Sequence, residues 1–255
     1  MSATPTTPRV LCLPGFAMNA KAFHGRLSQA QRIIKGAVEL VFVEPPNVML
    51  PPDFDGTTAG EAHIITEDTP RSWWDWQGNH VGFKSNAELD PLLRYLREIL
   101  ETQGPFDGIW GFSQGAATAP ILCALVSQPS LSPIFAAPSS SPSVVWPPKQ
   151  FKFAILCSGF LPLDRKLEAW FAEPLDVPTL HVLGREDVVA IAERSLANVP
   201  RFKDSRLEWH SGGHHIPRSA HWSLFFKEYM LHHLGDDLPS GAKLVSSPVQ
   251  MLGKL

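Results

Sequence analysis

The stretch FDGIWGFSQGAA, residues 106–117, decides the fold of this 255-residue chain. Its apolar start predicts a buried strand, and the apolar residues from Ala116 onward predict a helix. Between them, GFSQG at 111–115 has the G-x-S-x-G spacing of a sharp strand-to-helix turn with Ser113 at its tip. The glycines suit this turn because a Cβ at 111 or 115 would press on the adjoining backbone. The alternative is a glycine-rich turn in which the serine only caps the helix.

The alternation of strand and helix extends along the whole chain. Short apolar runs predict strands at Arg9–Leu13, Val38–Val43, Phe106–Trp110, Phe153–Ser158, Thr179–Leu183 and Arg206–His210. Helical spacing predicts helices at Ala20–Ile34, Leu89–Leu100, Gln114–Ser127, Val189–Val199 and Ala220–His233. This order is typical of an α/β fold with a mostly parallel central sheet of about six strands and helices on both faces. Because no linker divides the chain, we expect residues 1–255 to form a single domain.

Two insertions and the tail differ from this pattern. Residues 44–80 carry several prolines and then the run RSWWDW at 71–76, and residues 129–148 are rich in serine and proline. Long loops in compact domains are often functional, so we expect both to lie near the active site. The clustered tryptophans of the first insertion fit packing onto the core, contact with a substrate, or both. Residues 235–255 have little pattern and are expected to be loosely ordered.

Composition excludes several classes of protein. Apolar residues make up 44% of the chain and charged residues 18%, which argues against disorder. The net charge of −3 and the lack of basic runs argue against a nucleic-acid partner. No segment reaches the roughly 18 continuous apolar residues of a membrane span. The start of the chain lacks the features of a secretory signal, and three widely spaced cysteines fit reduced buried thiols, so we expect a cytoplasmic protein.

A serine at such a turn needs a base and an orienting acid to become a nucleophile. In hydrolases with this turn, the acid and then the histidine follow the serine in the chain. The predicted strand at 179–183 runs into GRED at 184–187, and the strand at 206–210 runs into SGGHHIP at 211–217. Both segments leave the carboxyl ends of strands, where catalytic groups gather in open α/β sheets.

The residue types leave more than one choice of acid. Asp187 follows a strand at the right edge, although an aspartate there can also act only as a helix cap. Glu186 is adjacent but would point in another direction. Asp164 follows the preceding strand and is the rival acid. The acid is therefore Asp187 or Asp164 on these grounds.

The base is also open between neighbouring histidines. His210 and His215 compete with His214, and together with His181 they raise the question of a metal site. No H-E-x-x-H or C-x-x-C spacing occurs, and the glycines at 212 and 213 suit a turn better than a ligand-bearing helix. We therefore expect neither a metal nor another cofactor.

An acyl-transfer site also needs backbone N–H groups that stabilise the oxyanion. One is expected from the residue after the nucleophile, which is Gln114. The second is expected from the loop after the first strand, LPGFAMN at 13–19. Phe16 is the candidate there, because Gly15 permits a tight turn that aims the Phe16 N–H inward. A plain strand–helix turn would explain the same glycine.

Across residues 9–234 the chain resembles the FSH family of serine hydrolases. The resemblance rests on six blocks: LCLPGFAMNA at 11–20, RSWW at 71–74, FDGIWGFSQGAA at 106–117, SGF at 158–160, HVLGRED at 181–187 and HSGGHHIP at 210–217. It implies a compact α/β-hydrolase in which Asp187 is the acid and His214 the base. The family usually reads His-Gly in the first loop, where this chain has Pro14-Gly15. Proline removes the N–H of residue 14 but leaves that of Phe16.

Together these observations predict a serine hydrolase that cleaves a small-molecule acyl ester through an acyl-enzyme, with a Ser113–His214–Asp187 triad. One alternative is a thiohydrolase that releases acyl or polyketide chains from a carrier protein or coenzyme A. Another is a hydrolase-fold binding protein without catalysis. Trp73, Trp74 and Trp76 are the candidates for an apolar acyl pocket.

Overall fold

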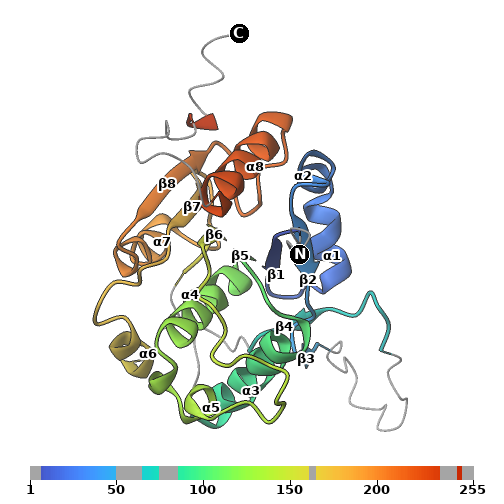
Figure 1. Cartoon of the computed structure of the whole chain (residues 1–255). Coiled ribbons are helices and arrows are strands. Elements are labelled where there is room, and N and C mark those ends of the chain that lie inside the picture. The colour runs from blue at the N-terminus through green and yellow to red at the C-terminus, as the bar shows by residue number, and fades with distance from the viewer. Residues whose placement is uncertain (1–6, 50–64, 75–85, 161–164, 236–245, 249–255) are drawn as a thin grey trace, which may run out of the picture.

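A six-stranded sheet forms the centre of the molecule (Figure 1). The structure is a computed structural model and describes residues 7–49, 65–74, 86–160, 165–235 and 246–248. The sheet order is β2-β1-β5-β6-β7-β8, and every neighbouring pair is parallel. The strands are β1 Arg9–Leu13, β2 Glu39–Phe42, β5 Gly108–Phe112, β6 Phe153–Cys157, β7 Thr179–Gly184 and β8 Ser205–His210. The predicted fold class, a mostly parallel α/β sheet of about six strands, is confirmed.

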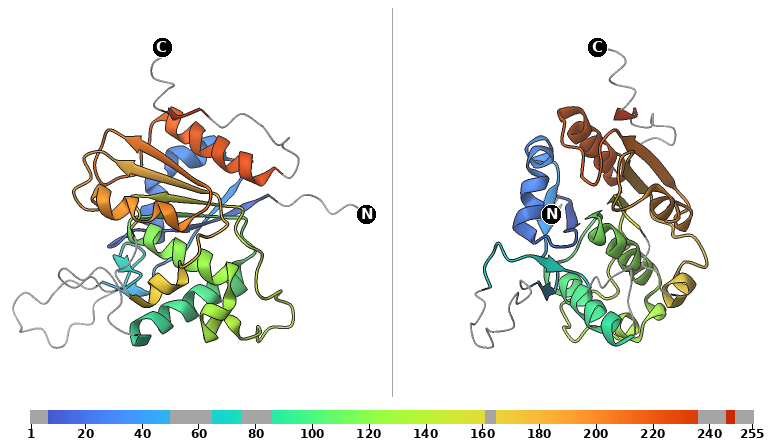
Figure 2. Two further views of the ribbon diagram at one scale, coloured as in Figure 1. Left: turned by 90° about the vertical axis from the view of Figure 1, so that its left-hand side faces the viewer. Right: turned by 180° about the vertical axis from the view of Figure 1, so that it is seen from behind.

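Helices cover both faces of this sheet (Figures 1 and 2). One face carries α1 (Ala20–Arg26), α2 (Ser28–Ile34) and α8 (Ala220–Leu234). The other carries α3 (Asn86–Gln103), α4 (Gln114–Ser127), α5 (Pro133–Ala136) and α6 (Arg165–Trp170). The remaining elements are α7 (Ala192–Leu196), two 3₁₀ turns (Pro129–Leu131 and Val199–Arg201) and an antiparallel pair, β3 (Asn47–Val48) with β4 (Arg71–Ser72). Within the described ranges, no helix has the length and apolar character needed to cross a bilayer.

The four inner strands, β1, β5, β6 and β7, are buried on both sides because both faces of the sheet are covered. Successive side chains of a strand point to opposite faces. Val10 and Cys12 accordingly join the cluster under α1, α2 and α8, whereas Leu11 and Leu13 join the cluster under α3 and α4. All three cysteines are buried and free, and burial raises the pKa of the Cys157 thiol to about 12. This two-sided burial explains why the inner strands consist mainly of apolar residues.

The strand before the serine lies two residues later than the sequence predicts. The predicted range was Phe106–Trp110, but β5 is Gly108–Phe112. Its end is extended because Gly111 pairs with Leu13 of β1 and Phe112 pairs with Cys157 of β6. The strand therefore ends directly before Ser113 and delivers that residue at the carboxyl edge of the sheet.

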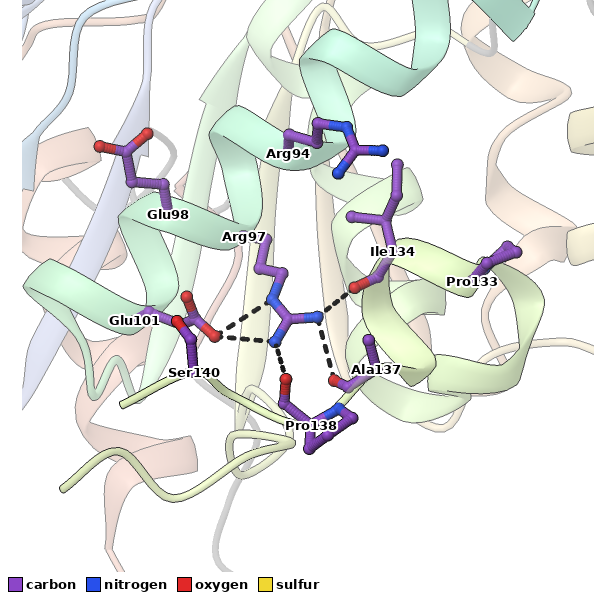
Figure 3. A pocket seen from close by; sticks show the side chains of 9 residues that line it. All are labelled: Arg94, Arg97, Glu98, Glu101, Pro133, Ile134, Ala137, Pro138 and Ser140. Atoms are coloured by element: carbon purple, nitrogen blue, oxygen red, sulfur yellow. Dashed lines mark hydrogen bonds and ion pairs between the residues drawn. The ribbon is translucent and has the colours of Figure 1, made fainter. Parts of the chain in front are cut away.

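The 129–148 insertion is fastened to α3 by one arginine. The Arg97 guanidinium donates hydrogen bonds to the Glu101 carboxylate and to the backbone carbonyls of Ile134, Ala137 and Pro138 (Figure 3). It also lies 4.4 Å from the centre of the Trp146 ring. Residues 143–145 line a hollow with Pro105 and Phe106, which precede β5. That part of the insertion therefore lies at the end of β5 opposite Ser113.

We expect Arg97→Met to lower the free energy of unfolding by about 1–3 kcal/mol, because several carbonyls lose a charged donor while the aliphatic stem is retained. Urea denaturation followed by tryptophan fluorescence measures this. Arg94→Met is the matched control, since Arg94 is exposed on the same helix and forms none of these bonds (Figure 3). The control should stay within about 0.5 kcal/mol of the wild type. Equal losses in the two variants would contradict the role given to Arg97.

Candidate active site

Ser113 occupies a strained turn between β5 and α4. Its φ of 51° and ψ of −117° lie in a region that non-glycine residues rarely adopt. Its N–H still donates to the Cys157 carbonyl at 2.9 Å, so the sheet bonding continues into the turn. A Cβ on Gly111 would lie 2.5 Å from the Gly115 oxygen, and one on Gly115 would lie 2.1 Å from the Leu13 oxygen. The expectation that a side chain at 111 or 115 would press on backbone is confirmed.

Three side chains far apart in the chain meet at the carboxyl edge of the sheet. The Ser113 Oγ lies 2.9 Å from the His214 Nε2 atom, and the His214 Nδ1 atom lies 2.8 Å from the Asp187 Oδ2 atom. The serine follows β5, the aspartate follows β7 and the histidine follows β8. The hydroxyl, the imidazole and the carboxylate therefore form one continuous hydrogen-bonded chain.

Glycines allow the His214 loop to fold back over the edge of the sheet. A Cβ on Gly184 would lie 2.4 Å from the Gly213 oxygen and 2.5 Å from the Gly212 oxygen. The Glu186 N–H donates to the same Gly212 carbonyl at 3.1 Å. The loop after β8 therefore rests directly on the loop after β7, which brings the imidazole to the carboxylate. The His214 ring also packs on the Phe112 ring, with centres 5.0 Å apart.

The Asp187 carboxylate is held by its own loop as well as by the histidine. Its Oδ1 atom accepts the backbone N–H groups of Val189 at 2.9 Å and Ala190 at 2.8 Å. Burial alone raises the pKa of Asp187. Hydrogen bonds from His214 and the Ala190 amide favour the charged form and outweigh burial, so the pKa lies below its ordinary value. The Asp187 carboxylate is thus an ionised, oriented acceptor at neutral pH.

The competing histidines have other surroundings. The His210 Nδ1 atom accepts the Gly212 N–H at 3.2 Å, and burial lowers the pKa of His210 to about 4. His215 is exposed, with its ring 4.7 Å from that of His210. His181 is buried in β7, and burial lowers its pKa to about 4. Among the histidines that the structure describes, His214 is the one hydrogen-bonded to Ser113.

Of the two other carboxylates considered as the acid, one lies within the described residues. Glu186 is exposed in the turn before Asp187. Asp164, the rival acid, lies outside the described residues. Within the described ranges no three or more His, Cys, Asp or Glu side chains gather closely enough to hold a metal ion.

The loop after β1 lies directly against the serine turn. A Cβ on Gly15 would lie 2.9 Å from the Phe112 ring and 3.3 Å from the Ser113 Cβ. Phe16 is the next residue, so its backbone is held close to Ser113. Gln114 is the first residue of α4, and the N–H groups in the first turn of a helix have no acceptor within the helix. The two predicted oxyanion donors therefore belong to segments in direct contact.

Two of the three tryptophans predicted to bind substrate lie in the core. Trp73 and Trp74 are only 1% and 2% exposed and belong to the core cluster that includes α3. Trp76 lies outside the described residues. A substrate-binding role for these three residues stays a prediction.

Two features at this edge were given no role by the sequence analysis. The Gln114 side chain, not only its N–H, bonds to the backbone of Trp73 and Trp74. Ser158 has a φ of 49° directly after β6 and lies beside Asp187. The sequence does contain a signal for Ser158, because this residue directly follows a buried strand whose carboxyl end lies at the same edge. The Gln114 contacts had no sequence signal because their partners lie some 40 residues away.

Comparison with known proteins places the chain among serine hydrolases. The family model "Serine hydrolase (FSH1)" matches residues 1–226. The Danio rerio protein named esterase OVCA2 is 30% identical over 90% of this chain and 98% of its own length. The Homo sapiens protein of the same name is 33% identical over 83% of this chain and 90% of its own. The crystal structure of Arabidopsis thaliana SOBER1 superposes with a TM-score of 0.59 at 17% identity, covering 89% of this chain and 99% of that one.

We expect Gly115→Ala to lower the free energy of unfolding by about 1–3 kcal/mol and to reduce activity, because its Cβ would enter the contact with the Leu13 carbonyl. Thermal unfolding and ester hydrolysis measure the two effects. The same substitution at Gly25 in α1 is the control, since a Cβ there meets nothing within 4 Å. Gly25→Ala should be neutral or stabilise by up to about 1 kcal/mol. A Gly115→Ala variant as stable and active as Gly25→Ala would contradict this account of the turn.

Proposed function

This chain belongs to the FSH1 family of serine hydrolases, and we propose that it hydrolyses small acyl esters with Ser113 as nucleophile, His214 as general base and Asp187 as orienting acid. The continuous hydrogen-bonded chain from the Ser113 Oγ to the Asp187 carboxylate carries the proposal. A hydroxyl becomes a competent nucleophile only when a positioned base takes its proton. Each link in this chain has hydrogen-bond length, so no rearrangement is needed before attack.

In the first half-reaction, the Ser113 Oγ attacks the ester carbonyl carbon and its proton moves to the His214 Nε2 atom. The Asp187 carboxylate accepts the Nδ1–H, which fixes the tautomer and stabilises the imidazolium that forms. The carbonyl oxygen becomes an oxyanion, for which the N–H groups of Phe16 and Gln114 are the proposed donors. The start of α4 adds its positive dipole end to the same region.

The tetrahedral intermediate then expels the alcohol, which takes the proton from His214. This leaves the acyl group on the Ser113 Oγ. In the second half-reaction, water gives a proton to His214 and attacks the acyl carbon. The bond between the acyl carbon and the Ser113 Oγ then breaks, and the Oγ regains its proton from the His214 imidazole. The carboxylic acid is released. The residues named so far supply every proton transfer in this cycle.

We expect a fluorophosphonate probe to label the wild-type protein at one site, Ser113, because the probe reacts only with an activated serine. Intact-mass spectrometry and peptide mapping measure the stoichiometry and the site. Ser113→Ala should abolish labelling, and His214→Ala should slow it strongly. Ser223→Ala, which removes another buried hydroxyl, in α8, should label like the wild type.

Two results would reject the catalytic assignment. One is a folded wild-type protein that does not label, which would favour the non-catalytic binding protein. The other is undiminished labelling of Ser113→Ala, which would move the nucleophile elsewhere. Circular dichroism on each variant keeps loss of fold apart from loss of reactivity.

An ester and a thioester with the same acyl chain separate the two hydrolase readings, because the triad chemistry is the same and only the leaving group differs. We expect the ester to be hydrolysed with a kcat/KM at least equal to that of the thioester, and both activities to vanish in Ser113→Ala. A thioester kcat/KM more than tenfold higher would make acyl-thioester hydrolysis the function instead. Initial rates on both substrates over a range of acyl lengths provide the comparison.

A further inference from the structure

Trp73 is buried, and each of its polar groups has a partner. Its side chain and backbone are 1% exposed. Its backbone N–H donates to the Gln114 Oε1 atom at 2.9 Å, and its carbonyl accepts the Asn47 side-chain amide at 3.2 Å. Its indole Nε1–H donates to the Pro14 carbonyl at 2.8 Å. A residue that only filled the core would not need this set of bonds, all of them to other segments.

The segment Arg71–Trp74, which begins with β4, holds both ends of the loop that contains Phe16. At one end the Trp73 indole binds the Pro14 carbonyl, and at the other the Met18 N–H donates to the Arg71 carbonyl at 3.2 Å. Between these points Gly15 has no side chain to restrict its backbone. Ala17 has a φ of 55°, a conformation that its own sterics disfavour. The shape of the loop is therefore imposed by its contacts.

The same segment is also fixed to the turn that carries Ser113. The Gln114 side-chain amide accepts the Trp73 N–H and donates to the Trp74 carbonyl at 2.9 Å. Gln114 is fully buried, so neither bond competes with water. Trp73 thus connects the loop of Phe16 to the residue whose N–H is the other proposed oxyanion donor.

We propose that Trp73 is a positioning residue for the oxyanion hole, which sets the Phe16 loop relative to the Gln114 amide through its indole bond to Pro14 and its backbone bond to Gln114. A peptide unit is planar, so holding the Pro14 oxygen also fixes the direction of the Gly15 N–H and the start of the next peptide. Donors placed in advance stabilise developing charge without reorganisation. This inference rests on the proposed ester hydrolysis by Ser113.

Positioning and plain packing predict different kinetics. Loss of an oxyanion donor lowers kcat by about 10²–10³-fold, and loss of its support should cost less. The carbonyl oxygen of the bound ester interacts with these donors more weakly than the oxyanion does, so KM should change little. If Trp73 only packed the core, a Phe ring in its place would lower stability without a selective effect on kcat.

The test is Trp73→Phe, which keeps an aromatic ring and removes the indole N–H. We expect kcat for a soluble acyl ester to fall about 10- to 100-fold, with KM within about threefold of the wild type. The inhibition constant of an alkylboronic acid, which forms a tetrahedral adduct with the serine, should rise by the factor by which kcat/KM falls. Affinity for a non-hydrolysable ether analogue of the substrate should stay unchanged.

Trp146→Phe is the matched control. The Trp146 indole also donates to a backbone carbonyl, that of Phe135, at 2.8 Å, and its ring also packs against the core. It belongs to the insertion held by Arg97, so its loss should leave kcat unchanged. Gln114→Met is a second variant for the case in which Trp73→Phe does not fold, since it retains the Gln114 N–H and removes both side-chain bonds. It should show the same selective loss of kcat and of boronic acid affinity.

The inference is overturned if Trp73→Phe, or Gln114→Met in its place, keeps a kcat within twofold of Trp146→Phe. It is equally overturned if kcat falls while boronic acid affinity does not. These failures are distinct from failure of the proposed function, which would appear as absent esterase activity and absent Ser113 labelling in the wild type.

Discussion

Backbone crowding at Ser113 is the constraint on which the site depends. The serine adopts a positive φ only because the chain turns from β5 into α4 within one residue, and that turn leaves no space for a Cβ at Gly111 or Gly115. The same lack of a side chain at Gly115 lets the Leu13–Pro14 backbone approach. One steric requirement therefore sets Ser113 at the edge of the sheet and brings the loop of Phe16 beside it.

A second constraint is the fixed direction of Asp187. One carboxylate oxygen accepts two amides of its own loop, and the other accepts from His214. The loop bonds form a tight turn at Asp187 and not a helix cap, because α7 begins only at Ala192 and has Ile191 as its N-cap. The two carboxylate oxygens face different partners, one in the loop and one on His214. The turn fixes the position of the carboxylate, and the carboxylate in turn orients the imidazole.

The tryptophan segment shows how burial and function can share residues. Trp73 and Trp74 lie in the core and expose almost no surface. For these two residues, the expectation of packing onto the core is confirmed. The polar atoms of Trp73 nevertheless connect the β3–β4 pair, the loop that contains Phe16 and the turn at Ser113. Buried polar groups are costly unless they are paired, so such a network rigidifies the segments that it joins. The network thus gives a rigid frame to the two N–H groups proposed as oxyanion donors.

Periodicity and turn chemistry in the sequence were enough for the six strands, most helices and the turn at Ser113, because each depends on residues close together in the chain. The strand before Ser113 was misplaced by two residues, since its end is set by pairing with β1 and β6. Residue types alone left Asp164, His210 and His215 as rivals, and family resemblance was needed to choose. The rest of the site, including the Gly184 contact with the His214 loop and the Trp73 bond to Pro14, joins residues that only folding brings together. No local pattern encodes a hydrogen bond across 59 positions, because its geometry is the sum of every turn between them.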